Sequence, residues 1–500
     1  MSQRVARRIL IFSGLLSVAL TVPVPVPSAQ QSAAPVFQDA NALPAGLKGA
    51  RIRSMIETAN SGDPERFRRY FLEECTAEMR NAIPLDDFIS SSLDFRRQTG
   101  GIDFFSIRTY APERPADTVV ICKDRALGGW VALTFRFGDD PAFLVSRLQV
   151  GQARPPAGPA EPPLTEKQAL DEIRGLTDGL IKSGWYSGTV LVAKGPDILL
   201  AAAGGEADKG DHTKINIDTK FNLGSMNKMF TATAVARLVE SGRLSWDDPL
   251  SRFVDETWLP KSITDTITIR HLITHTSGLG SYFNEVYDRS SRALFRKLDD
   301  YKPLIKDDKP AFPPGERFQY SNTGMFLLGV VIEKVTGEDY FDYIRKTISE
   351  PLRMTNTDCY EMDAPVENLA IGYVSDWKSP AKWRNNLYLH VLKGGPAGGG
   401  FSTVKDLRQF ALGLLSDKLV SRPTREMMWT DFKGGRYGYG FQVVQGPAGK
   451  VVGHSGGFPG INSQLDIYVD SGYIVAAMTN IDGASALADR IGRTLARVKK

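Results

Sequence analysis

The chain has 500 residues, of which 42% are hydrophobic and 24% are charged, and a formal net charge of +4 at pH 7. This is an ordinary globular composition with room for about two or three domains, which excludes a disordered chain and a bundle of membrane spans. So small a net charge favours neither a nucleic-acid partner nor a membrane-surface partner. The three cysteines lack C-x-x-C spacing and are too few for a disulfide scaffold.

The first thirty residues have the layout of a secretory signal peptide. Three arginines precede an apolar run over residues 9–22, and a segment rich in proline and small residues follows it. The run is short for a membrane span, so we expect residues 1–30 to be cleaved and the protein to be exported, periplasmic or secreted, with no membrane span remaining. An uncleaved anchor is the alternative. Cleavage lowers the net charge by three, to +1, and export permits a disulfide between Cys75 and Cys122 without requiring one.

Residues 45–152 are predicted to form a small α+β domain. Asp63 and Pro64 have the pattern of a helix start, an N-cap followed by proline in the first turn. Apolar residues alternate with polar or small ones over 131–137 and 144–150, which is typical of half-buried antiparallel strands. Helices followed by long strands resemble, in pattern alone and without a motif, the cone-shaped domain of nuclear transport factor 2 and its relatives.

Residues 153–164 are predicted to be a linker, because five prolines within ten residues disfavour both helix and sheet. A second domain follows over 165–500. Its predicted strands lie near its two ends, at 188–203 and 440–479, and enclose a mostly helical middle at 225–419. Strands from both ends imply one antiparallel sheet flanked by helices with a helical insertion, so the whole chain is α/β (α+β) in class.

One serine lies in a sequence pattern typical of a hydrolase nucleophile, but the residues that follow it do not fit that fold. The segment 453–457 fits G-x-S-x-G, the strand-to-helix turn that carries the nucleophile of α/β-hydrolases. Here a strand pattern follows instead of a helix, and no histidine comes after His454, whereas that fold needs its histidine downstream of the serine. We therefore do not expect Ser455 to be the nucleophile.

A second pattern, Ser225-x-x-Lys228, is the better candidate for nucleophilic chemistry. The lysine follows the serine by one helical turn and lies on the same face. It can act as a base if burial lowers its pKa from about 10.4 towards 7 or 8. Three other S-x-x-K patterns begin at residues 375, 379 and 402, but only the apolar run at 229–239 predicts burial of the lysine beside it.

The base needs a partner, and Tyr320 and Asn322 are predicted to supply it. A phenol can relay a proton, and an amide can donate a hydrogen bond to a substrate carbonyl. Tyr282 and Asn284 have the same spacing. We prefer the later pair because it lies between a Pro-Gly loop and the apolar helical pattern at 324–335. The alternative for either pair is a structural role, in which its polar groups form hydrogen bonds within a core.

The segment His454-Ser455-Gly456 is predicted to end a strand along which a substrate could add as a further strand. The backbone N–H groups of Gly457 and Ser225 would then face each other and form an oxyanion hole.

Two other patterns favour structural roles. His271 and His275 are four residues apart on a predicted helix and could contact one metal ion, but no third ligand accompanies them, so we predict no metal. The glycine-rich segment 394–400 lacks the lysine of a P-loop, and we expect it to pack closely beside the active-site cleft.

The chain holds three motifs in this order: Ser225-x-x-Lys228, Tyr320-x-Asn322 and His454-x-Gly456. Together with the flanking segments 221–224, 242–249 and 269–279, they resemble the penicillin-recognising serine hydrolases. This family includes class C β-lactamases, D-alanyl-D-alanine carboxypeptidases, D-aminopeptidases and related esterases. The resemblance covers about residues 165–500.

The resemblance implies an acyl intermediate on Ser225, general-base and general-acid duties shared by Lys228 and Tyr320, and no metal or other cofactor. The β-lactamases usually have lysine where His454 stands, and a histidine is mostly neutral at pH 7, so potent β-lactamase action is not expected. We predict a serine hydrolase for a small-molecule or peptide ester or amide, of esterase, D-aminopeptidase or carboxypeptidase type. The alternative is a non-catalytic binding or scaffold protein that retains the fold.

Overall fold

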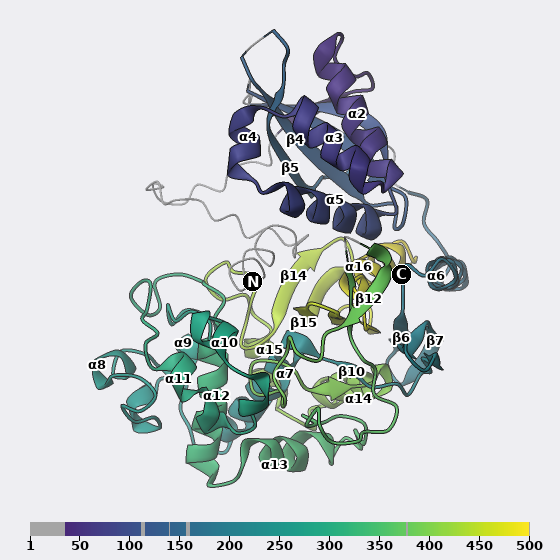
Figure 1. Cartoon of the computed structure of the whole chain (residues 1–500). Helices are drawn as coiled ribbons and strands as arrows, with labels where there is room; N and C mark the ends of the chain where they lie inside the picture. The colour runs from purple at the N-terminus through teal and green to yellow at the C-terminus, as the bar shows by residue number, and fades with distance from the viewer. Residues whose placement is uncertain (1–35, 112–115, 140, 157–160, 377–378, 500) are drawn as a thin grey trace. The chain divides into compact units, whose positions relative to one another are not determined.

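The computed structural model of the chain describes residues 36–111, 116–139, 141–156, 161–376 and 379–499 (Figure 1). The chain divides into two compact units, residues 1–161 with 375–382 and residues 162–374 with 383–500. The boundary at 161 lies inside the predicted linker. The predicted signal peptide, residues 1–30, lies outside the described residues.

The first unit has one strand, then four helices, then four further strands among its described residues. Its helices are α2 (Leu47–Ser61), α3 (Pro64–Glu74), α4 (Ala77–Ala82) and α5 (Leu85–Thr99). Its strands are β1 (Val36–Ala40), β2 (Ile102–Ala111), β3 (Asp117–Asp124), β4 (Trp130–Phe137) and β5 (Val145–Gln152). They form one antiparallel sheet in the order β1-β2-β3-β4-β5.

Local sequence explains this arrangement. Asp63 caps α3 by accepting a hydrogen bond from the Glu65 N–H, and Pro64 occupies the first turn, as predicted. Apolar side chains of α2, α3 and α5 pack with those of the strands in one core. Cys75 and Cys122 are buried free thiols in this core, so the permitted disulfide is not formed, and burial raises the pKa of each thiol to about 12. The likeness to nuclear transport factor 2 stays a prediction.

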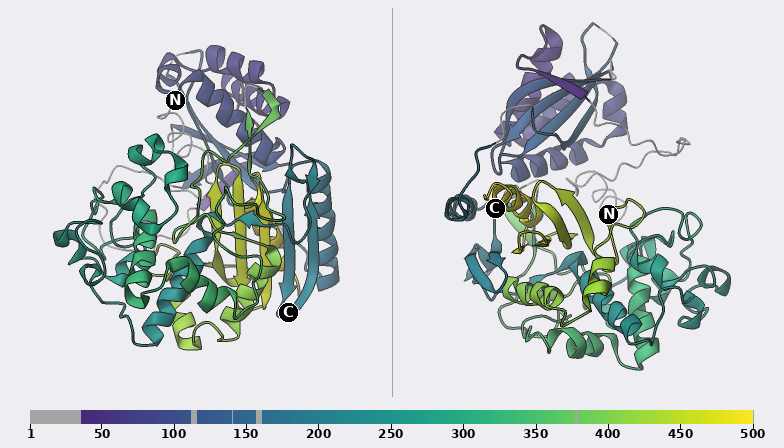
Figure 2. Two further views of the ribbon diagram at one scale, coloured as in Figure 1. Left: turned by 60° about the horizontal axis from the view of Figure 1, so that its bottom comes forward. Right: turned by 180° about the vertical axis from the view of Figure 1, so that it is seen from behind.

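The second unit is built on a six-stranded antiparallel sheet in the order β14-β15-β16-β17-β6-β7 (Figure 2). Its strands are β6 (Gly188–Lys194), β7 (Asp197–Gly204), β14 (Gln442–Gly446), β15 (Gly449–Phe458), β16 (Ile461–Tyr468) and β17 (Tyr473–Thr479). β17 pairs with β6, so strands from the two ends of the unit meet in the middle of the sheet. The predicted fold class is therefore confirmed.

Helices pack on this sheet. α6 (Glu166–Lys182), which begins with the Thr165 and Gln168 capping box, and α16 (Ala484–Leu495) contact each other and the sheet. α14 (Val404–Leu415) packs against β17 and β6, and every residue of β17 is buried. This complete burial explains the continuous apolar run of β17, because a strand covered on both faces has no solvent side.

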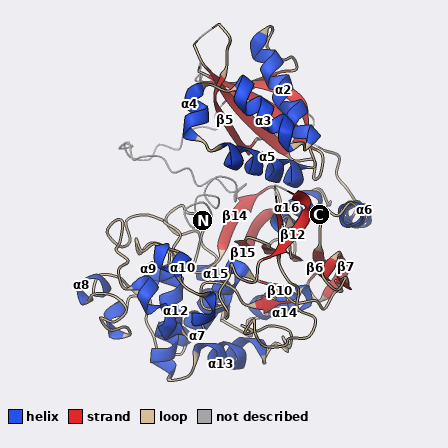
Figure 3. Cartoon of the chain, in the orientation of Figure 1, coloured by secondary structure: helices blue, strands red, loops and turns tan. Residues whose placement is uncertain are grey.

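The insertion between β7 and β14 is mostly helical (Figure 3). Its α-helices are α7 (Asn227–Glu240), α8 (Lys261–Thr264), α9 (Ile269–Ile273), α10 (Glu285–Arg289), α11 (Lys302–Ile305), α12 (Asn322–Thr336), α13 (Tyr340–Ile344), α14 and α15 (Arg422–Met428). Short strands accompany them: β8 (Glu206–Asp208), β9 (Thr213–Lys214), β10 (Phe221–Asn222), β11 (Tyr373–Asp376), β12 (Ser379–Asn385) and β13 (Phe401–Ser402). Among the described residues, no helix is long and apolar enough to cross a membrane.

Two local predictions are wrong. The segment 454–456 does not end a strand, because β15 continues to Phe458 through pairing with β16. His275 does not share a helix with His271, because α9 ends at Ile273 and His275 has the left-handed φ of 56°.

Candidate active site

Ser225 lies in a single 3-10 turn, Gly224–Met226, that leads directly into α7. The turn is fixed from its N-terminal side by the Asn222 side chain, whose Oδ1 accepts a hydrogen bond from the Gly224 N–H at 2.8 Å. Gly224 has a φ of 49°, and a Cβ there would lie 2.9 Å from the Gly457 nitrogen. Glycine is therefore required where the turn meets β15.

Lys228 points its amine at the serine from within the core. Nζ lies 3.1 Å from Ser225 Oγ, 2.9 Å from Asn322 Oδ1 and 2.5 Å from the Ala397 carbonyl oxygen. The side chain is fully buried, and burial holds the pKa of the amine well below its usual range. Within the described part of the chain, no carboxylate forms an ion pair with it.

The neighbours of a neutral amine determine where its lone pair points. Asn322 Oδ1 and the Ala397 carbonyl oxygen can only accept hydrogen bonds, so each takes one N–H of the neutral amine. The lone pair is then left for the third neighbour, the Ser225 hydroxyl. A neutral amine in this arrangement can accept the Ser225 proton.

Tyr320 and Asn322 reach the same point from the start of α12. Ser321 caps this helix by accepting a hydrogen bond from the Gly324 N–H, which fixes the residues on both sides. The Asn322 amide donates to Ser281 Oγ at 3.1 Å, so its oxygen faces Lys228. The Lys228 amine lies 4.8 Å from the centre of the Tyr320 ring.

The Tyr320 phenol is protonated at neutral pH. Burial of the hydroxyl raises its pKa above the usual value, and a hydrogen bond with the Ser225 side chain acts in the opposite direction. The residue as a whole is 38% exposed, so one side of the ring faces solvent. A protonated phenol beside the serine can donate a proton to a leaving group.

The competing pair has structural roles. Tyr282 is 5% exposed and packs against Tyr301 and Phe326. Asn284 caps α10 by accepting hydrogen bonds from two backbone N–H groups. Both residues are satisfied within the fold, which favours the choice of Tyr320 and Asn322.

The His454 imidazole is neutral, and both of its ring nitrogens form hydrogen bonds. Its Nδ1 lies 2.6 Å from the Ser455 carbonyl oxygen, which can only accept, so the proton is assigned to Nδ1. Nε2 then accepts a hydrogen bond from the Tyr437 hydroxyl at 3.0 Å. Burial lowers the pKa of His454 to about 3. The ring therefore provides no cation for a substrate carboxylate.

β15 presents a free edge beside the serine. β14 pairs with it only as far as Gly453, whereas β16 pairs with its other edge up to Phe458. A Cβ on Gly456 would lie 1.9 Å from the Leu223 carbonyl oxygen, so the strand packs directly against the turn that holds Ser225. No strand of the described residues covers this edge over 454–458, which leaves it open to an added strand.

The structure assigns the other patterns to packing. Ser455 Oγ accepts a hydrogen bond from Gln442, and His271 Nδ1 accepts one from the Thr268 N–H at the start of α9. The glycine-rich segment 394–400 packs beside Ser225, as predicted, and it carries Ala397, whose carbonyl the sequence did not single out. Among the described residues, no group of three or more histidine, cysteine, aspartate or glutamate side chains is arranged to hold a metal.

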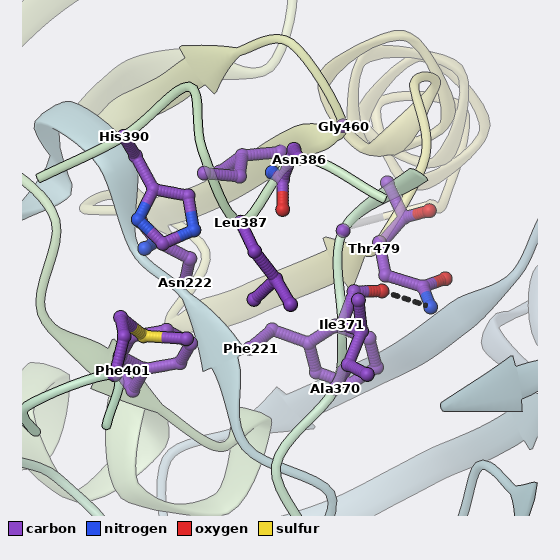
Figure 4. A pocket seen from close by; sticks show the side chains of 14 residues that line it. Phe221, Asn222, Ala370, Ile371, Asn386, Leu387, His390, Phe401, Gly460 and Thr479 are labelled. Carbon is purple, nitrogen blue, oxygen red and sulfur yellow. Dashed lines mark hydrogen bonds between the residues drawn. The ribbon is translucent and has the colours of Figure 1, made fainter. Parts of the chain in front are cut away.

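A hollow of about 290 Å³ lies beside β10 (Figure 4). Asn222, which fixes the serine turn, forms part of its wall. The other lining residues include Phe221, Ile371, Asn386, Leu387, His390 and Phe401. Neither Ser225 nor Lys228 lines it, so this hollow is not the site itself.

Comparison with known proteins adds to this geometry. The family profile described as Beta-lactamase matches residues 173–498, which is more than half of the chain. The chain belongs to the Beta-lactamase family. It is accordingly a serine hydrolase of this superfamily, and the match covers almost all of the second unit together with residues 375–382 of the first.

Individual members of this superfamily resemble the chain at about 20–30% identity. Penicillin-binding protein 4* of Bacillus subtilis (strain 168) is 31% identical over 315 residues, covering 60% of this chain and 69% of that protein. The solved structure of a penicillin-binding protein from Bacillus halodurans has 30% identity and a TM-score of 0.59, covering 64% of this chain and 98% of that one. The D-amino acid amidase from Ochrobactrum anthropi SV3 has 22% identity and a TM-score of 0.56, covering 66% and 99%, and shares the fold.

Gly456→Ala tests the close approach of β15 to the serine turn. Its Cβ would lie 1.9 Å from the Leu223 carbonyl oxygen, so backbone must shift, and we expect a loss of about 1–3 kcal/mol in the free energy of unfolding. The matched control is Gly457→Ala, whose Cβ would meet nothing within 4 Å. Denaturant unfolding of both variants measures the difference, and equal stability would contradict the packing described.

The low pKa of His454 predicts acid sensitivity. Between pH 6.5 and about 3 the unfolded chain binds a proton at His454 that the folded chain does not, so stability falls as the pH falls. Relative to His454→Asn, the parent should lose about 2 kcal/mol of unfolding free energy between pH 7 and pH 5, at about 1.4 kcal/mol per pH unit. Denaturant unfolding at both pH values measures this, and a constant difference would mean that the folded histidine titrates normally.

Proposed function

We propose that the second unit hydrolyses an ester or amide bond through an acyl intermediate on Ser225. The observation that carries this proposal is the placement of a buried amine, Lys228 Nζ, 3.1 Å from the Ser225 hydroxyl oxygen, with a pKa that burial lowers well below its usual range. A serine hydroxyl is a weak nucleophile at neutral pH and needs such a base. The proposal also rests on membership of the Beta-lactamase family.

The reaction proceeds in two halves. Ser225 Oγ attacks the substrate carbonyl carbon while its proton passes to Lys228 Nζ, and the oxygen that becomes negative accepts hydrogen bonds from the Ser225 and Gly457 N–H groups. The tetrahedral species then expels the leaving group, which takes a proton delivered through Tyr320. In the second half water attacks the acyl group, its proton is removed by the same base, and Ser225 regains its hydrogen as the acid departs.

Asn322 and β15 hold the substrate in this proposal. The Asn322 amide lies between Lys228 and Ser281 at the cleft, and the free edge of β15 offers backbone groups to an extended chain. Because His454 is neutral and internally bonded, the site lacks the fixed cation that would select a carboxylate at this position. An esterase or peptidase activity, including action on D-amino-acid amides or peptides, therefore fits better than potent β-lactamase action.

Two aromatic residues lie close in sequence to residues of the site, and we expect them to set a preference for apolar groups. Phe458 directly follows Gly457, and Phe283 lies two residues after Ser281, which the Asn322 amide contacts. The two rings are 5.8 Å apart, and Phe283 is 42% exposed. We expect the cleft to favour substrates with an apolar or aromatic acyl group, because exposed rings gain from being covered.

The competing proposal is a binding or scaffold protein that keeps the fold without chemistry. The complete set of serine, buried amine and phenol argues against it, because an amine buried without an opposite charge destabilises the fold. We also propose that the protein is exported, on the strength of its first thirty residues alone.

Ser225→Ala and Lys228→Met together test the proposed chemistry. Each should reduce hydrolysis of a p-nitrophenyl ester by at least about a thousandfold, since one removes the nucleophile and the other its base. Lys228→Met conserves volume and removes a buried polar group, so its unfolding free energy should equal or exceed that of the parent. Labelling by a fluorophosphonate, located by peptide mass, should occur at Ser225 in the parent and be lost in both variants. Normal turnover by Ser225→Ala would exclude the proposal.

The two aromatic residues predict a change in substrate preference. Phe283→Ala should lower kcat/KM for a phenylacetyl or hexanoyl ester about tenfold while changing that for an acetyl ester less than twofold, because only the longer group reaches the ring. Val286→Ala, another exposed apolar residue nearby in the sequence, is the matched control and should leave the ratio unchanged. The two esters compared at one pH measure the ratio, and an equal loss for both would refute the preference.

A further inference from the structure

His275 is a buried histidine to which the proposed reaction assigns no step. It is fully buried and has a φ of 56°, a backbone conformation that side-chain-bearing residues rarely adopt. Its Nε2 is buried and has no hydrogen-bond partner among the described residues. A strained backbone and an unsatisfied polar atom both disfavour folding, and such features cluster at functional sites.

His275 accepts hydrogen bonds from the residues on both sides of Tyr320. Its carbonyl oxygen accepts a hydrogen bond from the Gln319 N–H at 2.8 Å, and its Nδ1 accepts one from the Ser321 N–H at 3.1 Å. These two donors are the residues immediately before and after Tyr320. One residue therefore fixes the backbone on both sides of the phenol.

The imidazole also packs on the phenol itself. Its ring centre lies 4.4 Å from that of Tyr320 and 4.5 Å from that of Tyr437, so it contacts both rings. Since the Ser321 N–H can only donate, Nδ1 must be unprotonated, and the ring is neutral with its proton on Nε2. Burial also lowers the pKa of His275 well below its usual range, which agrees with a neutral ring.

We propose that His275 is a positioning residue that aims the Tyr320 hydroxyl at Ser225. It holds the backbone of Tyr320 by two hydrogen bonds and restrains its ring by contact. This inference rests on the proposed function, in which Tyr320 delivers a proton to the leaving group. Small displacements of a proton donor are costly, because proton transfer needs hydrogen-bond distance.

Substitution of His275 tests the proposal in the full chain. His275→Ala should lower kcat for a p-nitroanilide, whose amine leaving group must take up a proton, about 10- to 100-fold with KM changed less than about threefold. His275→Asn should recover most of this loss, because asparagine tolerates the left-handed conformation and its Oδ1 can take the place of Nδ1. His271→Asn, a histidine of the same segment that does not contact Tyr320, is the matched control and should stay within about twofold of the parent.

A double-mutant cycle with Tyr320→Phe separates positioning from a general loss of structure. If His275 acts through the phenol, His275→Ala should reduce kcat by less than about twofold in the Tyr320→Phe background. An equal loss in both backgrounds would overturn the proposal, as would a folded His275→Ala with kcat within about twofold of the parent. If His275→Ala does not fold, the activities of His275→Asn and His275→Gln test the proposal instead. The longer glutamine side chain places its amide oxygen away from the position of Nδ1. A higher activity of His275→Asn than of His275→Gln supports the proposal, and equal activities overturn it.

The same cycle distinguishes this inference from the proposed function. Unimpaired turnover by Tyr320→Phe would show that the assignment of Tyr320 is wrong. An impaired Tyr320→Phe beside an unimpaired His275→Ala would leave the proposed function standing and reject the positioning role.

Discussion

The active site depends on the burial of one amine without an opposite charge. Lys228 lies on α7, whose residues 227–236 are all buried, so water does not solvate the charged form. Burial of an uncompensated ammonium is unfavourable, and the group responds by losing its proton. The surrounding hydrogen bonds suit the neutral form: two neighbours accept, and the third is the Ser225 hydroxyl. The geometry of the serine, the Asn322 amide and the glycine-rich segment follows from this one constraint.

The same constraint extends to the histidines. Burial lowers the pKa of both His454 and His275, as it lowers that of Lys228. The hydrogen bonds that the two imidazoles make to Ser455, Tyr437 and Ser321 also suit neutral rings. In the proposed function, a neutral His454 where the β-lactamases usually have lysine favours uncharged ester and amide substrates.

Sequence reasoning located the residues of the site but not the contacts that hold them. Ser225, Lys228, Tyr320 and Asn322 were found because a catalytic spacing coincided with flanking apolar helices, which predicted burial. The Ala397 carbonyl was missed because a backbone oxygen 169 residues away leaves no side-chain pattern. β15 was predicted to stop early because glycine-rich sequence has low strand propensity, whereas pairing with β16 extends it to Phe458. The left-handed φ of His275 likewise had no local sequence signal, and it ended a helix that was expected to continue.

The most direct test of this account is the pKa of the Lys228 amine. Protein labelled with ¹³C at the lysine Cε positions can be titrated by NMR, and the Lys228 signal can be assigned by its absence from Lys228→Met. The account predicts a resonance of a neutral amine at pH 8 and a titration midpoint well below the usual value of 10.5. A midpoint near 10.5, with the amine charged at pH 8, would contradict it.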